Sequence, residues 1–209
     1  MLLAVKDLII GYDEPIINSS FSSEFSIGDI VVVKGDNGVG KSTLFKTLSG
    51  LIPVISGEIN LKDNLSIGWV DSYKPNSAYL TVENYLSFGI NPTESEIYEI
   101  LNKFKLEFKT DVFLDALSDG QFRKLSICRQ LLKKPDILFL DEPSVYLDVT
   151  SKILLESLLI DFSKSSLIFC LGLLLHAGFV LPSLRANWLQ PSTNVGKRIA
   201  LVGMLMLLH

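Results

Sequence analysis

The sequence contains few cysteines, and this scarcity excludes several kinds of site. Among its 209 residues are two cysteines, Cys128 and Cys170, and their spacing fits neither a set of metal ligands nor a disulfide framework. We therefore expect two reduced thiols. A basic excess is also missing, because the formal net charge is -4. This charge argues against a nucleic-acid binder that relies on a broadly basic surface, so no nucleic-acid partner is expected. It does not exclude a local basic patch.

Targeting segments, repeats and linkers are equally scarce. Residues 1–7 contain no basic segment followed by a long apolar stretch, so they do not resemble a secretory signal. The chain shows no internal repeat and no low-complexity linker. Acidic residues are absent after residue 165, where three basic residues remain: Arg185, Lys197 and Arg198. Because the composition changes abruptly there, we consider the two parts separately.

The part before residue 170 has the pattern of an alternating α/β domain. Short apolar runs such as Ile30–Lys34 and Ile137–Leu140 predict strands that are buried on both faces, as in a parallel sheet. Further strands are expected at Leu2–Ile10, Ile59–Leu61, Ser66–Val70 and Ser166–Cys170. Helices are expected at Ser42–Leu51, after a Thr93–Glu96 capping box, at Ser118–Lys134 and at Ile153–Phe162.

The strongest motif is a glycine-rich loop between a predicted strand and a predicted helix. Residues 35–42 read GDNGVGKS and match the pattern G-x-x-x-x-G-K-[ST]. The glycines allow backbone N–H groups to turn toward phosphate oxygens, and the helix adds its positive end. Lys41 is then expected to reach the β- and γ-phosphates of a nucleotide, and Ser42 to ligate Mg²⁺.

A second motif places two acids at the end of a buried strand. Residues 137–142 read ILFLDE, and ligands of open α/β sheets bind at this carboxyl edge. Asp141 is expected to hold Mg²⁺ through water, and Glu142 to polarise the attacking water. Together the two motifs predict a P-loop nucleoside triphosphatase.

The sequence Leu117-Ser118-Asp119-Gly120-Gln121 narrows the class further. It resembles the signature motif of ABC-type ATPases, usually LSGGQ, with Asp119 in place of a glycine. The resemblance covers roughly residues 2–170. It implies a P-loop core with a parallel sheet, a small antiparallel β region and a short helical subdomain at about residues 73–134. The whole would form a domain of residues 1–170, followed by an atypical apolar tail of residues 171–209.

The resemblance also implies roles for individual residues. Glu142 and Lys41 would be catalytic, Ser42 and Asp141 would bind the metal, and Asp148 resembles the aspartate of the D-loop. Ser118, Gly120 and Gln121 would contact ATP bound to a second copy, and Asp119 must then point away from its γ-phosphate. The residues implied to bind ATP within one chain are Tyr12, which would stack on adenine, and Gly35, Asn37, Gly38, Gly40, Lys41, Ser42 and Thr43.

Two expected residues are missing from the ABC pattern. Ser72 stands where the family has a glutamine, a feature shared with subunits similar to the haem-export ATPase of cytochrome c biogenesis. The family's switch histidine should follow Ser166–Cys170, but His176 comes several residues later. These departures leave open a degenerate subunit that binds ATP and hydrolyses it poorly.

The tail allows three interpretations. Leu167–Leu184 contains 18 residues without a charged side chain, a length that marginally permits a membrane span. The tail could instead be a divergent packed end of the domain. It could also be a truncated or out-of-frame end of the gene, which the loss of acids favours.

The function implied by the resemblance is ATP hydrolysis, with ATP and Mg²⁺ as cofactors, in a membrane transporter. The chain has no convincing bundle of membrane helices, so a separate membrane-spanning subunit would supply the pore. Two ATPase subunits, alike or different, would pair at the cytoplasmic face of the inner or plasma membrane. A soluble ABC protein of translation or DNA repair is a second possibility, although such proteins usually carry two of these domains or a long coiled coil.

Overall fold

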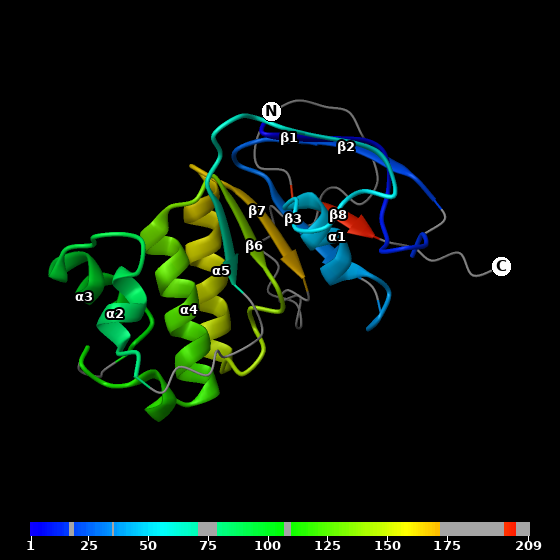
Figure 1. Ribbon diagram of the computed structural model, residues 1–209. Helices are drawn as coiled ribbons and strands as arrows, with labels where there is room; N and C mark the ends of the chain where they lie inside the picture. Colours follow the sequence, from blue (N-terminus) through cyan, green and yellow to red (C-terminus); the bar gives the residue numbers. More distant parts are fainter. Residues whose placement is uncertain (17–18, 35, 71–78, 107–109, 172–198, 204–209) are drawn as a thin grey trace.

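Two β-sheets and six helical segments make up the described part of the chain. The computed structural model describes residues 1–16, 19–34, 36–70, 79–106, 110–171 and 199–203 (Figure 1). An antiparallel sheet has the order β2-β1-β4, and a parallel sheet has the order β5-β6-β7-β3-β8. The strands are β1 (Leu3–Ile9), β2 (Phe21–Phe25), β3 (Ile30–Lys34), β4 (Ser56–Leu61), β5 (Ile67–Val70), β6 (Ile137–Leu140), β7 (Leu167–Leu171) and β8 (Ile199–Gly203). The helices are α1 (Lys41–Leu48), α2 (Val82–Ser87), α3 (Glu94–Lys103), the 3₁₀ turn η1 (Leu114–Ala116), α4 (Asp119–Lys133) and α5 (Val149–Ser163).

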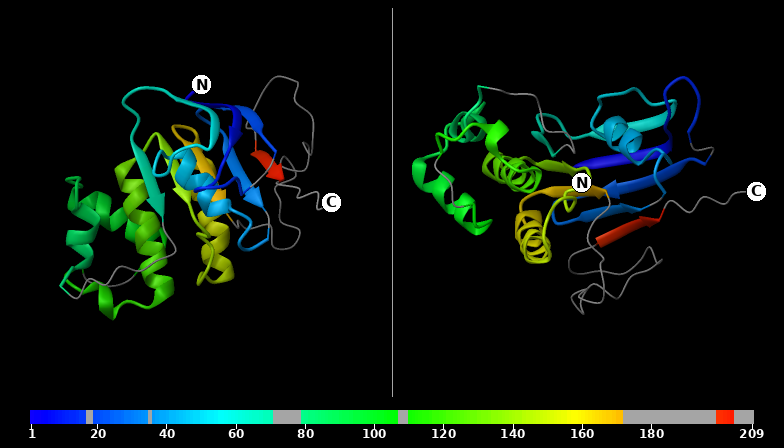
Figure 2. Two further views of the ribbon diagram at one scale, coloured as in Figure 1. Left: turned by 45° about the vertical axis from the view of Figure 1, so that its right-hand side comes forward. Right: turned by 90° about the horizontal axis from the view of Figure 1, so that it is seen from below.

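The parallel sheet is covered on both faces, as the apolar runs predicted. Successive side chains of a strand point to opposite faces, and all four residues of β6 are buried. Leu138 and Leu140 belong to the core shared with α4 and α5, whereas Phe139 belongs to the core shared with α1 and the antiparallel sheet. Helix α1 lies between the two sheets, as the views from other directions show (Figure 2).

Aromatic rings hold the strand that carries the two acids. The rings of Phe139 and Phe169 stack with centroids 5.0 Å apart, and Phe45 of α1 meets Phe139 edge-on at 5.2 Å. Trp69 of β5 lies 5.2 Å from Phe139 on the other side. Rings in this offset or edge-on geometry stabilise one another beyond the burial of their surfaces. They fix β6 and α1 together, so the residues just beyond β6 face the start of α1.

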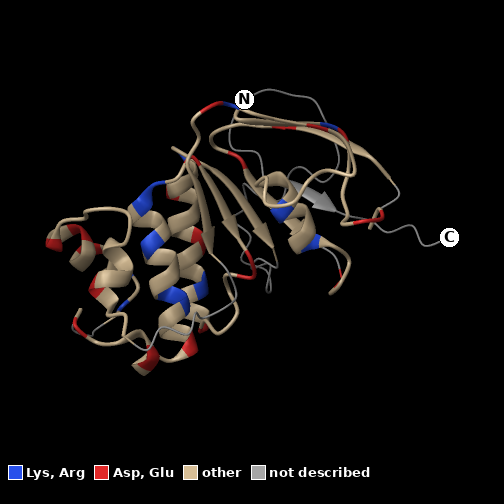
Figure 3. Cartoon of the chain, in the orientation of Figure 1, with Lys and Arg blue, Asp and Glu red and all other residues tan. Residues whose placement is uncertain are grey.

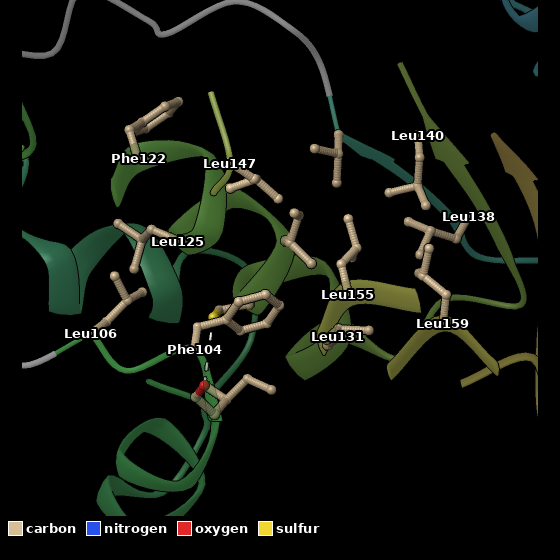
Figure 4. Packing of buried hydrophobic residues seen from close by; sticks show 14 of the residues in the cluster. Phe104, Leu106, Phe122, Leu125, Leu131, Leu138, Leu140, Leu147, Leu155 and Leu159 are labelled. Carbon is tan, nitrogen blue, oxygen red and sulfur yellow. Dashed lines mark hydrogen bonds between the residues drawn. The ribbon is translucent and has the colours of Figure 1, made fainter. Parts of the chain in front are cut away.

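A second core joins the helical subdomain to α4 and α5. Phe104 and Leu106 pack with Leu125 and Leu131 of α4, while Leu155 and Leu159 of α5 face the sheet (Figure 4). The predicted capping box is confirmed: Thr93 Oγ1 accepts from Glu96 N–H, and a Glu96 carboxylate oxygen accepts from Thr93 N–H.

The structure differs from the sequence-based expectation in three elements. Strand β2 was not expected, because its sequence FSSEF is too polar to predict a strand. The sequence predicted a helical middle part of the chain but gave no bounds for the short helix α2. Strand β8 was not expected in the tail. Leu167–Leu171 is a strand paired with β6 and β3, so this part of the uncharged run is not a membrane helix.

The tail lies largely outside the described residues. Residues 172–198 and 204–209 are not described, and they include the remainder of the uncharged run. Residues 199–203 form β8, which pairs in parallel with β3. The proposed boundary between residues 170 and 171 stays a prediction.

Candidate functional site

The glycine-rich loop joins β3 to α1 at the carboxyl edge of the parallel sheet. Gly38 has φ 83° and Gly40 has φ 98°, values in the left-handed region that glycine adopts without strain. A Cβ on Gly40 would also lie 2.8 Å from Cγ2 of Ile16, so a side chain there would require the Ile16 side chain to shift. The loop can therefore reverse direction tightly enough to present backbone N–H groups at the start of α1.

The positive end of α1 carries no capping side chain. Gly40 occupies the N-cap, and no acidic residue lies in the first turn of this described helix. The helix N-terminus favours an anion at this position. The Lys41 ammonium lies over the same loop, where its Nζ donates to the carbonyl of Asp36 at 2.8 Å. A phosphate group placed at the helix start would meet both the N–H groups and this cation.

The two main motifs meet in space, as the sequence predicted. Ser42 Oγ of α1 donates to Oδ2 of Asp141, the first residue after β6, at 3.3 Å. These residues are 99 positions apart in the chain and come together because β6 and α1 pack through Phe139 and Phe45. A hydroxyl and a carboxylate oxygen are hard ligands suited to Mg²⁺, which uses few protein ligands beside phosphate oxygens and waters.

Glu142 has an unusual backbone conformation. Its φ is 47°, in the left-handed region that a residue with a Cβ adopts at a cost of about 1–2 kcal/mol. Such conformations are retained where surrounding contacts determine them, and they cluster at functional sites. The acid predicted to polarise water thus has an unfavourable backbone conformation that contacts with the rest of the fold must stabilise.

The signature segment begins α4 as a capped helix. Ser118 is the N-cap: its Oγ accepts from Gln121 N–H at 3.2 Å, and the Gln121 side chain accepts from Ser118 N–H at 2.9 Å. Asp119, the first residue of the helix, is exposed. These contacts lie within one chain, so the role of this segment toward a second copy stays a prediction.

Gly120 has a neighbour in its own chain. A Cβ built on this residue would lie 2.8 Å from the carbonyl oxygen of Tyr146, in the segment that follows β6. Tyr146 itself has φ 65°. The absence of a side chain at position 120 therefore allows α4 to approach this segment closely, a reason for glycine that the motif alone does not reveal.

Two basic residues of α4 contact the segment after β6, and sequence reasoning missed both. Arg123 Nη2 donates to the carbonyl of Glu142 at 3.1 Å and lies 3.4 Å from that of Asp141. Lys124 pairs with Asp148 at 3.3 Å. Basic residues are frequent along α4 (Figure 3), so the sequence offered no signal that singled out these two.

Asp148 caps α5 as well as pairing with Lys124. Its carboxylate accepts from the N–H and the hydroxyl of Ser151 at 2.9 and 2.7 Å. These hydrogen bonds, assisted by Lys124, hold the pKa of Asp148 well below its ordinary value. The next residue back, Leu147, is buried with Phe122 and Leu125 of α4 (Figure 4).

The remaining predicted site residues lie in the turn after β1, in the glycine-rich loop, in α1 or outside the described residues. Tyr12 is 58% exposed in a tight turn after β1, where Ile16 N–H donates to the carbonyl of Ile10. Ile16 in turn lies against Gly40, so the turn that carries Tyr12 lies beside the glycine-rich loop. Asn37 is exposed in that loop, and Thr43 is buried in α1. Gly35, Ser72 and His176 lie outside the described residues.

Comparison with known proteins identifies the class. Residues 19–145 match the family described as ABC transporter, and this match covers more than half of the chain. The chain belongs to the ABC transporter family. Within that family it is similar to the ATP-binding subunits of transporters.

Two curated relatives of this ABC chain are named as zinc import ATP-binding proteins. The chain is 29% identical over 195 residues to the zinc import ATP-binding protein ZnuC 1 of Hahella chejuensis, covering 92% of this chain and 72% of that protein. It is 38% identical over 141 residues to the zinc import ATP-binding protein ZnuC of Rickettsia bellii, covering 66% of this chain and 60% of that protein. The chain thus spans between about three fifths and three quarters of the length of these two relatives.

Solved structures agree with the fold assignment. A putative ABC transporter ATP-binding protein of Pyrococcus furiosus is 27% identical with a TM-score of 0.75, covering 82% of this chain and 91% of that one. An inward-facing, putative metal-chelate type ABC transporter is 26% identical with a TM-score of 0.69, covering 81% of this chain and 72% of that one. Among the described residues of the present chain, no helix has the length and apolarity needed to cross a bilayer.

Proposed function

We propose that this ABC subunit binds Mg-ATP at the loop before α1 and hydrolyses it with Glu142 as the residue that polarises water. The observation that carries the proposal is the contact between Ser42 Oγ and Asp141 Oδ2 at 3.3 Å, which joins the phosphate loop to the acidic end of β6. Glu142 follows directly, at the edge of the sheet where ligands of parallel α/β folds bind. In this proposal the three residues face the terminal phosphate.

Each residue has a separate role in this proposal. N–H groups at the start of α1 and the ammonium of Lys41 bind the β- and γ-phosphates. Ser42 and Asp141 hold Mg²⁺, directly or through water, and the ion neutralises phosphate charge. Tyr12 stacks on the adenine ring, and Asn37, Gly38, Gly40 and Thr43, together with Gly35, complete the loop and its helix.

The proposal extends to a pair of ATPase subunits on a membrane-spanning partner. The capped N-terminus of α4, with Ser118, Gly120 and Gln121, would face the γ-phosphate of ATP on the second subunit, and Asp148 would lie at the same interface. Helix α4 offers a free helix end for this purpose, because Ser118 and Gln121 satisfy only part of its N–H groups. The assembly would lie at the cytoplasmic face of the inner or plasma membrane.

Two substitutions test the proposed chemistry. Lys41→Ala should abolish tight binding of ATP, because it removes the cation that faces the phosphates. Glu142→Gln should retain Mg-ATP binding and lose turnover, because the amide cannot polarise water. Nucleotide binding is measured by equilibrium titration and turnover by phosphate release, with Lys134→Ala, an exposed residue of the opposite end of α4, as the control. Undiminished turnover by the Glu142→Gln protein would remove Glu142 from its role.

A weakly hydrolysing subunit is the main alternative. Ser72, Asp119 and the displaced His176 favour it, whereas the contact between Ser42 and Asp141 favours a working site. A single-turnover assay in the presence of the membrane partner separates the two functions. Bound ATP that persists unhydrolysed would establish the weak subunit.

The transported substrate is best sought among metal ions. The relatives described above are named zinc import proteins, and one structural neighbour is titled as a metal-chelate type transporter. The membrane partner selects the substrate in this family, so the chain itself supplies no specificity. Uptake of radioactive zinc by vesicles that contain the full transporter, compared with the Lys41→Ala transporter, tests this assignment. A relation to haem-export subunits stays a prediction, and haem serves as the competing substrate in the same assay.

A further inference from the structure

We propose that Arg123 is a positioning residue for ATP hydrolysis, because its guanidinium holds the backbone of Glu142. This inference rests on the proposed function of Glu142. Arg123 lies in α4, two residues after the signature segment. Its Nη2 donates to the carbonyl of Glu142 at 3.1 Å and approaches that of Asp141 at 3.4 Å. One nitrogen thus contacts the backbone of both acids.

The burial of Arg123 indicates that these contacts are specific. Its exposed fraction is 3%. A buried guanidinium is costly unless its N–H groups find acceptors, and carbonyl groups aimed at it supply part of that compensation. The hydrogen bonds of this buried guanidinium therefore favour a backbone in which the carbonyls of residues 141 and 142 point toward α4.

The conformation of Glu142 explains why such an anchor matters. With φ at 47°, the peptide plane after Glu142 is turned away from the direction that an ordinary extended or helical residue would give it. The hydrogen bond from Arg123 is made to the carbonyl of that plane. Losing it frees the residue to relax into a conformation of lower backbone energy, which would move the carboxylate away from the γ-phosphate.

A second arginine on the same helix provides a matched comparison. The Arg129 guanidinium lies 4.8 Å from the ring centroid of Tyr85 and 5.7 Å from that of Phe88, and its Nη2 donates to the carbonyl of Phe88 at 3.3 Å. It therefore fastens α4 to α2, within the helical subdomain and away from the acids. Loss of Arg129 tests the effect of removing an arginine from α4 without touching Glu142.

The experiment compares Arg123→Met, Arg123→Lys and Arg129→Met in the full chain. Methionine keeps much of the apolar stem and removes the donor, whereas lysine keeps one nitrogen donor and its charge. We expect Arg123→Met to lower kcat about ten-fold or more, as loss of a charge-assisted hydrogen bond that orients a reacting group would do. The dissociation constant of Mg-ATP should change less than kcat, because the shorter contact of Arg123 is to the carbonyl of Glu142, proposed for turnover, and the longer one is to that of Asp141, proposed for Mg²⁺. Arg123→Lys should recover part of kcat, and Arg129→Met should retain it.

Hydrogen exchange supplies a readout that does not depend on turnover. Amides of residues 142–147 should exchange faster in Arg123→Met than in wild type or Arg129→Met. Wild-type kcat and exchange in a folded Arg123→Met protein would overturn the proposal. If Arg123→Met does not fold, Arg123→Gln, a shorter and uncharged polar side chain, takes its place, and wild-type kcat and exchange in that folded protein would overturn the proposal.

The two proposals fail in different ways. If wild type and Glu142→Gln hydrolyse ATP equally, the proposed function of Glu142 fails, and with it the catalytic part of this inference. If Glu142→Gln is inactive while Arg123→Met keeps its kcat, only the positioning role of Arg123 fails.

Discussion

Replacing Gly120 with alanine sets two effects of opposite sign against each other. Gly120 is the second residue of α4, and alanine is favoured over glycine in a helix by up to about 1 kcal/mol. The new Cβ, however, would lie 2.8 Å from the carbonyl oxygen of Tyr146. That oxygen belongs to the backbone of a residue with φ 65°, so it cannot swing aside as a flexible side chain could. Forcing an extra methyl into a packed contact costs about 1–3 kcal/mol, so we expect a net loss of about 0–2 kcal/mol.

Urea unfolding without nucleotide measures this effect within a single chain. Any contact of Gly120 with ATP on a second subunit is absent under these conditions, so the measurement isolates the approach to Tyr146. Asp119→Ala is the control, because it alters the same turn without adding an atom near that carbonyl, and it should cost about 0.3–1 kcal/mol through the helix dipole. The reasoning is refuted if Gly120→Ala is more stable than wild type by about 1 kcal/mol, the value expected from helix propensity alone.

Two further predictions concern the supports of the site. Phe139→Ala should lower the free energy of unfolding by about 3–5 kcal/mol, because it removes a fully buried ring that contacts Phe45, Trp69 and Phe169; urea unfolding checks it, and Phe139→Leu should cost less. Asp148→Ala should cost about 1 kcal/mol at pH 7 by removing the cap of α5. Because the pKa of Asp148 is held below its ordinary value, this stabilisation is present above the unfolded pKa of about 3.9 and is lost as pH falls toward the folded pKa. Unfolding curves of the two proteins should therefore converge in acid, and a constant gap between them would contradict this account.

The sequence predicted those parts of the site that depend on local pattern. The loop at residues 35–42 needs glycines because the chain turns there with positive φ, and such positions are visible in the sequence. Strands β3 and β6 were predicted with their observed bounds, because runs of apolar residues buried on both faces differ from amphipathic elements. The meeting of Ser42 with Asp141 also followed, since the carboxyl ends of parallel strands share one edge of the sheet.

The contacts that sequence reasoning missed depend on tertiary packing. Arg123 lies on a helix with three other basic residues, Lys124, Arg129 and Lys133, and nothing in the pattern shows that it is buried while Lys133 is half-buried. The role of Gly120 toward Tyr146 was hidden by the motif itself, which already offered a reason for glycine. Strand β2 was missed because its pairing with β1 outweighs the weak strand preference of its serines and glutamate.

The start of α4 contacts the segment after β6 at four points. Gly120 approaches Tyr146, Arg123 holds Glu142, Lys124 pairs with Asp148, and Leu147 is buried with side chains of α4. Because packed contacts of this kind resist gradual deformation, α4 and the segment that carries Glu142 should move as one unit. In the proposed pair of subunits, ATP on one subunit binds the start of α4 of the other. Binding at one nucleotide site would then act on the acid of the second site through the chain itself, without a route through the membrane partner.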